Sequence, residues 1–210
     1  MKKTFLCLVL LSALLFSGSS VSAAQIFLSQ NKPYGLMTPA SAGYPDDGKK
    51  LTDGRFGTPV PTGTRSFYYR DPAYVGFRIE NADENGNFVI LLDLGECFSD
   101  LSSFALGYLN EPDAGIFAPL AVTFEISDGE TGHFETLGTV SLSEPTAKGC
   151  HTADLAVFIP EAPVSARFVR CVITPRTGYG ENGKTVPTRW TFVDELVVLQ
   201  GKTAVWEERE

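Results

Sequence analysis

The chain has 210 residues, of which 43% are hydrophobic and 20% are charged, and its 25 acidic against 17 basic side chains give a formal net charge of −8. This balance disfavours nucleic acids and anionic membrane surfaces as partners, because both repel a chain of the same sign. A length of this order is enough for one domain with a single hydrophobic core.

Residues 1–23 have the features of a secretory signal peptide. Two lysines precede an apolar run from Phe5 to Phe16, and small residues follow as far as Ala23. The apolar run is shorter than the roughly 20 residues of a membrane-spanning helix, and no later stretch is long or apolar enough to be one. We therefore predict a secreted protein, extracellular or periplasmic, in which residues 24–210 form one domain.

Short runs rich in Val, Ile, Phe and Tyr follow along the chain, and Gly and Pro interrupt nearly every window long enough for a helix. Eight such runs separated by turn residues predict an all-β sandwich or barrel. They span residues 73–80, 87–95, 102–109, 120–127, 134–142, 153–160, 166–174 and 190–199.

The order of apolar and polar residues within these runs predicts which strands have one solvent-exposed face. In 121–127, apolar and polar residues alternate, so Val122, Phe124 and Ile126 are expected to face the core. The runs "FVILLDLG" and "ELVVL" do not alternate, which favours strands covered on both faces. The segment Asn81–Asn87 contains an Asn-Gly pair between two apolar runs and predicts a tight hairpin.

Five pieces of the sequence occur in a familiar order: "YPDDGKKLTDG", "VILLDLGE", "AGIFAPLAVTFEISDG", "ARFVRCVITP" and "WTFVDELVVL". Their succession, from about Tyr34 to Gln200, resembles the discoidin-like domains of the galactose-binding superfamily. This superfamily includes coagulation-factor type C domains and many bacterial carbohydrate-binding modules. The resemblance implies a jelly roll of about eight main strands in two packed sheets.

The cysteines depart from the coagulation-factor pattern, in which a disulfide ties the termini. Here Cys97, Cys150 and Cys171 all lie inside the domain, so the bacterial modules without that bridge are more similar. Three cysteines allow at most one internal bridge, and the sequence leaves its pairing open.

The stretch "KLTDGRFGT" can form half of a calcium site. Asp53 offers a carboxylate, Lys50 and Arg55 offer carbonyl groups, and Thr58 offers a carbonyl and a hydroxyl, which are the oxygen ligands that calcium prefers. In similar modules the last strand supplies a further anion, and the resemblance assigns that role to Glu195. We therefore predict a structural calcium ion, against the alternative of a bare Asp-Gly turn and a solvated Glu195.

Few residues are available for catalysis. His133 and His151 are the two histidines, and the sequence lacks the GxSxG and HExxH motifs and a phosphate-binding glycine loop. Asp194 and Glu195 are adjacent, and neighbours on a regular strand point to opposite faces, so they are not expected to flank one glycosidic bond. We predict no catalytic residues, with a glycan-active hydrolase as the less favoured alternative.

A sugar-binding site needs aromatic faces for the sugar ring and planar donors and acceptors for its hydroxyls. Two loops combine these groups, and they contribute six candidate ligand-binding residues: Tyr68, Tyr69, Arg70, Arg176, Tyr179 and Asn182. The sequence thus predicts a secreted carbohydrate-binding module whose partner is a glycan or another cell-envelope component. A protein-interaction or adhesion module remains the alternative, since this fold hosts both uses.

Overall fold

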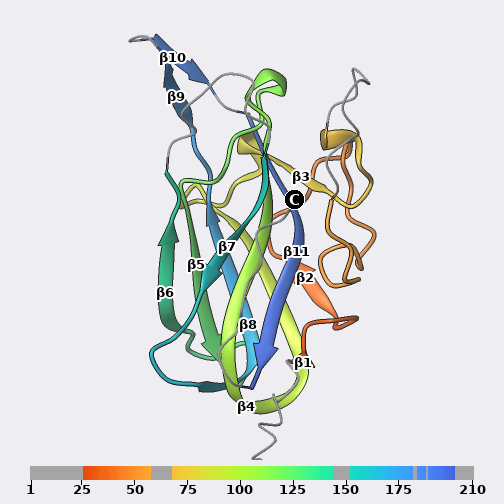
Figure 1. Cartoon of the computed structure of the whole chain (residues 1–210), viewed down its shortest axis with the longest axis vertical. Coiled ribbons are helices and arrows are strands. Elements are labelled where there is room, and N and C mark those ends of the chain that lie inside the picture. Colours follow the sequence, from red (N-terminus) through yellow and green to blue (C-terminus); the bar gives the residue numbers. More distant parts are fainter. Residues whose placement is uncertain (1–25, 58–67, 144–151, 182–183, 188, 202–210) are drawn as a thin grey trace, which may run out of the picture.

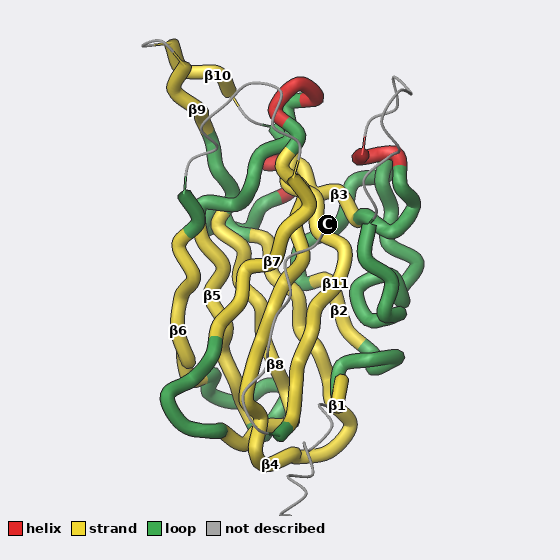
Figure 2. The backbone as a smooth tube through the Cα atoms, viewed as in Figure 1, coloured by secondary structure: helices red, strands yellow, loops and turns green. Residues whose placement is uncertain are grey.

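The computed structural model describes residues 26–57, 68–143, 152–181, 184–187 and 189–201. Within these ranges the chain forms strands and three short 3-10 helices (Figures 1 and 2). The strands are β1 (Ile26–Phe27), β2 (Tyr34–Leu36), β3 (Val75–Arg78), β4 (Phe88–Asn110), β5 (Ala121–Ser127), β6 (Glu135–Ser141), β7 (Thr152–Phe158), β8 (Val164–Thr174), β9 (Gly178–Glu181), β10 (Lys184–Pro187) and β11 (Trp190–Gln200); the helices are η1 (Tyr68–Arg70), η2 (Ile79–Asn81) and η3 (Pro112–Ala114).

The long strand β4 belongs to two layers of antiparallel strands. Its first part, 88–93, pairs with β2 and β8, and β8 continues through β5 to β6. Its last part, 104–110, lies between β7 and β11, and β11 also pairs with β1 and β3. Between the two parts the strand bends at the lower end of Figure 1, where Gly95 (φ 93°) and Asp100 (φ 61°) have left-handed conformations. The hydrogen-bonded path therefore folds back on itself as a sandwich.

Aromatic rings join the two layers inside the sandwich. Phe104 of β4 lies 6.0 Å from Phe124 of β5, measured between ring centroids, and Phe77 of β3 stacks on Phe88 of β4 at 5.0 Å. Apolar side chains from both layers form one buried cluster. Removing this surface from water is the main favourable contribution to folding, at roughly 25 cal/mol per Å² of apolar area.

The structure confirms the predicted all-β fold, since each of the eight predicted runs contains strand residues. The alternation in β5 is also confirmed, because Val122, Phe124 and Ile126 are buried and their neighbours are partly exposed. The prediction for "FVILLDLG" was wrong: this part of β4 alternates, with one face partly open to solvent. In "ELVVL" the second face is covered, because Phe56 packs over the outer side of β11.

The predicted hairpin at Asn81–Asn87 was also wrong. The segment does turn, with Gly86 at φ 78° and the Asp83 carboxylate accepting the N–H groups of Asn85 and Asn87. However, β3 pairs with β11, whereas β4 begins in the other layer beside β8. The turn therefore carries the chain across the core from one layer to the other, an arrangement that the local Asn-Gly signal does not encode.

Two further sequence predictions concern the cysteines and membranes. Cys97 is exposed and Cys171 is buried, and both are free thiols, so they do not pair with each other; Cys150 lies outside the described residues. Burial raises the pKa of the Cys171 thiol. In the described ranges no helix has the length and apolar character needed to cross a membrane.

Candidate functional site

The two acidic residues of β11 occupy an irregular position in the sheet. The pairing of β11 with β4 shifts register between Val193 and Leu196, and Asp194 and Glu195 fall in that interval. Both side chains are buried, and both accept backbone N–H groups of one segment: Gly57 donates to Asp194 Oδ2 at 2.8 Å, and Gly54 donates to Glu195 Oε1 at 3.1 Å. The expectation that these neighbours point to opposite faces was wrong, because a register shift re-aims side chains.

The turn that contains Asp53 is tied to both ends of the domain. The carbonyl of Thr52 accepts the N–H of Asn31, near the start of the described chain. The carbonyl of Leu51 accepts the N–H of Leu196, in the last strand β11. Gly54 has φ 79°, a conformation that suits glycine, and this places its N–H against Glu195. The structure thus brings the turn and the last strand together, as the sequence analysis expected.

The predicted calcium ligands fit a cation only in part. Glu195 Oε2 is buried and has no hydrogen-bond partner among the described residues. Burial raises the pKa of Glu195 to about 8, and the negative charges of Asp53 and Asp194 add to this shift. The unpartnered oxygen and the raised pKa both indicate that no positive charge among the described residues neutralises the Glu195 carboxylate. Within the described ranges, however, no group of three or more His, Cys, Asp or Glu side chains could hold a metal ion, so backbone oxygens would have to complete the shell.

The side chains of the other predicted metal ligands have different partners. The Lys50 ammonium donates to the carbonyl of Pro45 at 2.6 Å, and the Arg55 guanidinium pairs with Asp71 at 3.2 Å. Lys50 and Arg55 could therefore contribute to a cation site through their carbonyls alone. Thr58 lies outside the described residues.

A cluster of aromatic side chains lies beside β3, near one end of the sandwich. The ring of Tyr44 is perpendicular to that of Tyr69 at 5.8 Å and to that of Trp190 at 5.3 Å, and it makes an edge contact with Phe192 at 4.7 Å and 66°. Arg78 stacks over Trp190 at 5.3 Å. Perpendicular and tilted contacts of this kind stabilise aromatic pairs by about 0.5–1.5 kcal/mol each, which favours a fixed arrangement of the rings.

Glu111 fixes the position of η1 beside this cluster. The residue is 1% exposed, and its two carboxylate oxygens accept the N–H groups of Tyr68 at 3.2 Å and of Tyr69 at 3.0 Å. These first amides of a helix have no partner within the helix, so a buried anion satisfies them strongly. Glu111 is therefore a positioning residue for the tyrosines, and the sequence analysis did not identify it.

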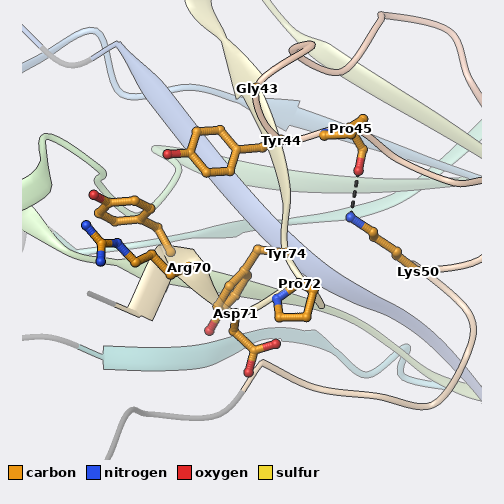
Figure 3. Close-up of a pocket in the computed structure, with 9 residues that line it drawn as sticks. Gly43, Tyr44, Pro45, Lys50, Arg70, Asp71, Pro72 and Tyr74 are labelled. Carbon is orange, nitrogen blue, oxygen red and sulfur yellow. Dashed lines mark hydrogen bonds between the residues drawn. The ribbon is translucent and has the colours of Figure 1, made fainter. Parts of the chain in front are cut away.

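Two adjoining hollows open on the aromatic cluster. The first has a volume of about 470 Å³ and is lined by Gly43, Tyr44, Pro45, Lys50, Tyr69, Arg70, Asp71, Pro72 and Tyr74 (Figure 3). The second has a volume of about 280 Å³ and is lined by Tyr44, Tyr69, Asp113, Ala114, Ile116, Trp190 and Phe192. Because Tyr44 and Tyr69 belong to both, the two hollows are parts of one surface depression.

The structure brings together only some of the predicted ligand-binding residues. Tyr69 and Arg70 line the first hollow, and Tyr68 packs in the aromatic cluster. Arg176 lines neither hollow: its side chain is buried and donates to the carbonyls of Ala118, Leu142 and Ser143. Its assignment to the ligand site was therefore wrong, since these bonds give it a structural role.

Two of the predicted ligand-binding residues lie away from the depression or outside the described residues, and three residues that were not predicted to bind the sugar line the depression. Tyr179 belongs to β9, and Asn182 lies outside the described residues. Tyr44 and Trp190 contribute rings to the depression, and Lys50, expected only as a carbonyl donor to a metal, contributes its ammonium group. The sequence gives little indication that these residues form one site, because residues 44, 69 and 190 are far apart in the chain and come together only in the fold.

Comparison with solved structures identifies the fold. Chitosan-binding module 1 of a chitosanase/glucanase from Paenibacillus sp. IK-5 superposes with a TM-score of 0.51 at 13% identity, covering 84% of this chain and 99% of that module. The family 32 carbohydrate-binding module of NanJ from Clostridium perfringens, solved with galactose, gives 0.51 at 12% identity, covering 84% and 100%. The chain has the discoidin-like, galactose-binding-like fold. At this level of identity the likeness establishes the fold alone.

A third solved structure with this fold has a TM-score of 0.50 at 13% identity. It is another Clostridium perfringens module, solved with GlcNAc-α-1,4-galactose, and the match covers 85% of this chain and 96% of that one. No protein-family model matches the sequence. No curated protein sequence matches it significantly either.

Proposed function

We propose that this chain is an exported, non-catalytic carbohydrate-binding protein that holds its ligand in the depression around Tyr44 and Tyr69. The observation that carries the proposal is the combination of fixed aromatic rings with charged donors and acceptors in one concave surface. Sugar rings present apolar faces to aromatic side chains and hydroxyls to polar groups, so this combination suits them. The carbohydrate complexes of structures with the same fold support the assignment.

Titration with a panel of oligosaccharides tests this function. Binding should be weak, with dissociation constants from millimolar to micromolar, or about −4 to −8 kcal/mol, and it should change the fluorescence of Trp190, which lines the second hollow. Tyr69→Ala should abolish binding. Phe27→Ala removes an aromatic ring that is exposed and lies in neither hollow, so it should bind as the wild type does. Absence of binding across the panel, or release of reducing ends by the purified protein, would contradict the proposal.

We propose in addition that the turn at residues 50–58 and Glu195 hold a structural calcium ion. The buried oxygen Oε2 of Glu195, which has no hydrogen-bond partner among the described residues, supports this assignment. An ion that binds the folded chain alone would stabilise it by roughly 2.7 kcal/mol at a hundredfold excess over its dissociation constant. Asp53 and the carbonyls of Lys50 and Arg55 are the further ligands that we assign to it, together with Thr58.

Thermal unfolding in calcium and in chelator tests whether the protein binds this calcium ion. The wild type should melt several degrees higher in calcium, and Asp53→Asn and Glu195→Gln should each remove the difference. Glu84→Gln, at an exposed acid remote from the turn in sequence, should keep it. Equal melting temperatures in both buffers, together with no metal in elemental analysis, would show that the turn works without an ion.

Export is the remaining part of the proposal, and it rests on the pattern of residues 1–23. Expression of the full chain in a bacterial host, followed by intact mass measurement of the exported product, tests it. A mature protein that begins near residue 24 is expected. Retention of the full-length chain inside the cell would contradict export.

A further inference from the structure

Two basic side chains line the first hollow of an otherwise acidic protein. Lys50 and Arg70 line it, and the carboxylate of Asp71, which lines it too, is engaged by Arg55 at 3.2 Å and by the N–H of Ala73 at 2.9 Å. Two basic groups and one paired acid thus line this hollow, and Asp113 lines the adjoining one, although the whole chain has a net charge of −8. A local excess of positive charge attracts anions, and a concave surface strengthens the attraction.

Lys50 and Arg70 are both able to bind a carboxylate. The Lys50 ammonium has three N–H donors, and one of them is directed at the carbonyl of Pro45 (Figure 3). Arg70 lies with its guanidinium 6.0 Å from the centre of the Tyr69 ring, and the planar guanidinium fork matches the two oxygens of a carboxylate. The ring of Tyr69 would then contact the sugar that bears that carboxylate.

The placement of the two basic groups indicates the length of the ligand. Lys50 and Arg70 lie on opposite sides of the hollow in Figure 3, with Tyr44 and Tyr74 between them. With this placement, each basic group can take a carboxylate from a different unit of a chain. The volume of about 470 Å³ falls in the usual range of small-molecule sites, roughly 300–1,000 Å³, and the second hollow extends it toward Trp190.

From these observations we propose that the depression recognises an acidic oligosaccharide that carries carboxylates on more than one unit, such as an oligomer of a uronic acid. One carboxylate contacts Arg70, another contacts Lys50, and an adjoining sugar face packs on the rings shared by the two hollows. This proposal rests on the proposed carbohydrate-binding function and specifies its ligand class.

Calorimetric titration with three oligosaccharides of equal length tests the ligand class: a tetramer of galacturonic acid, a tetramer of galactose and a sulfated tetramer of galactose. The uronate should bind at least about tenfold more tightly than the neutral tetramer, which corresponds to about 1.4 kcal/mol. This preference should shrink when the ionic strength is raised to about 1 M, because salt screens charges at a partly exposed site.

Variants of the two basic residues identify the contacts. Lys50→Gln and Arg70→Gln should each weaken uronate binding about fivefold or more, and by a larger factor than they weaken binding of the neutral tetramer, since a partly exposed charged contact contributes on the order of 1 kcal/mol. Lys50→Arg keeps the charge and should retain uronate binding. Lys49→Gln removes a neighbouring exposed lysine that lies outside the hollow and is the matched control.

The outcomes separate this proposal from the general function. Equal or tighter binding of the neutral tetramer would overturn the acidic ligand and leave carbohydrate binding intact. Preference for the sulfated tetramer would overturn the assignment of a carboxylate. If none of the three oligosaccharides binds and the wider panel also fails, both proposals are overturned.

Discussion

Replacement of the buried Glu195 by glutamine tests how the end of the domain is stabilised. In the folded protein without calcium, burial and the neighbouring acids raise the pKa of Glu195 from an ordinary value of 4.5 to about 8. The folded state therefore keeps a proton that the unfolded chain has already released. Stability must fall as the pH rises through this interval, because proton release then favours the unfolded chain.

The magnitude follows from the size of the interval. One pKa unit corresponds to about 1.4 kcal/mol, so a shift from 4.5 to about 8 lowers the free energy of unfolding by about 5 kcal/mol across it. Below pH 4.5 both states are protonated, and above pH 8 both are ionised, so no further change comes from this group. Glutamine has no charge to bury, and Glu195→Gln should therefore lack this dependence. A bound calcium ion should suppress it in the wild type, because the ion stabilises the carboxylate form.

Urea unfolding of the wild type and Glu195→Gln, measured in chelator between pH 5 and pH 8, gives the comparison. The difference between the two free energies should change by about 1.4 kcal/mol per pH unit, and taking the difference cancels groups that titrate equally in both proteins. In calcium the slope should disappear. Parallel curves for the two proteins in chelator would refute a buried Glu195 without a counter-charge.

Three further substitutions test the surroundings of the site. Glu111→Gln places an amide donor against the N–H groups of η1, so it should lower the free energy of unfolding by about 1–3 kcal/mol and weaken sugar binding in titration. Arg176→Met should lower stability by about 2–4 kcal/mol in urea and leave sugar affinity unchanged, because Arg176 lines neither hollow. Gly57→Ala should lower the melting temperature by several degrees, since its Cβ would lie 2.3 Å from the buried Tyr74 ring, whereas Gly35→Ala meets nothing within 4 Å.

The main strands could be predicted from the sequence because their signal is local. Alternation in β5 and breaks at Gly and Pro require no knowledge of the partner strand, and they predicted the class of fold correctly. The pairing of the strands could not be predicted in this way. The runs 87–95 and 102–109 form one strand in two layers, and the turn at Asn81–Asn87 crosses the core. Both features depend on long-range contacts, such as the stacking of Phe77 on Phe88, that a short window does not contain.

The candidate site was predictable where its residues are adjacent in the chain. Tyr69 and Arg70 were named because one loop combines aromatic and basic side chains, and both line the first hollow; the pairing of the Asp53 turn with Glu195 came from the family resemblance. Arg176 was misplaced because an arginine that binds buried carbonyls has the same sequence context as one that binds a ligand. The bulge at residues 194 and 195 depends on pairing with β4, so strand periodicity alone predicted the wrong faces.

Arg55, like Lys50, belongs both to the proposed calcium turn and to the surroundings of the proposed sugar site. Its backbone N–H donates to Asp53 at 2.8 Å, and its guanidinium pairs with Asp71 in the wall of the first hollow. The Arg55 side chain is 58% exposed, and such ion pairs contribute about 0–1 kcal/mol. Coupling through this pair can therefore change sugar affinity by no more than about fivefold. If this ion pair carries the coupling, sugar affinities measured in calcium and in chelator, at a temperature where both forms are folded, should differ within that factor, and Arg55→Gln should reduce the difference. A loss of affinity well beyond fivefold in chelator would mean that calcium shapes the wall of the hollow directly.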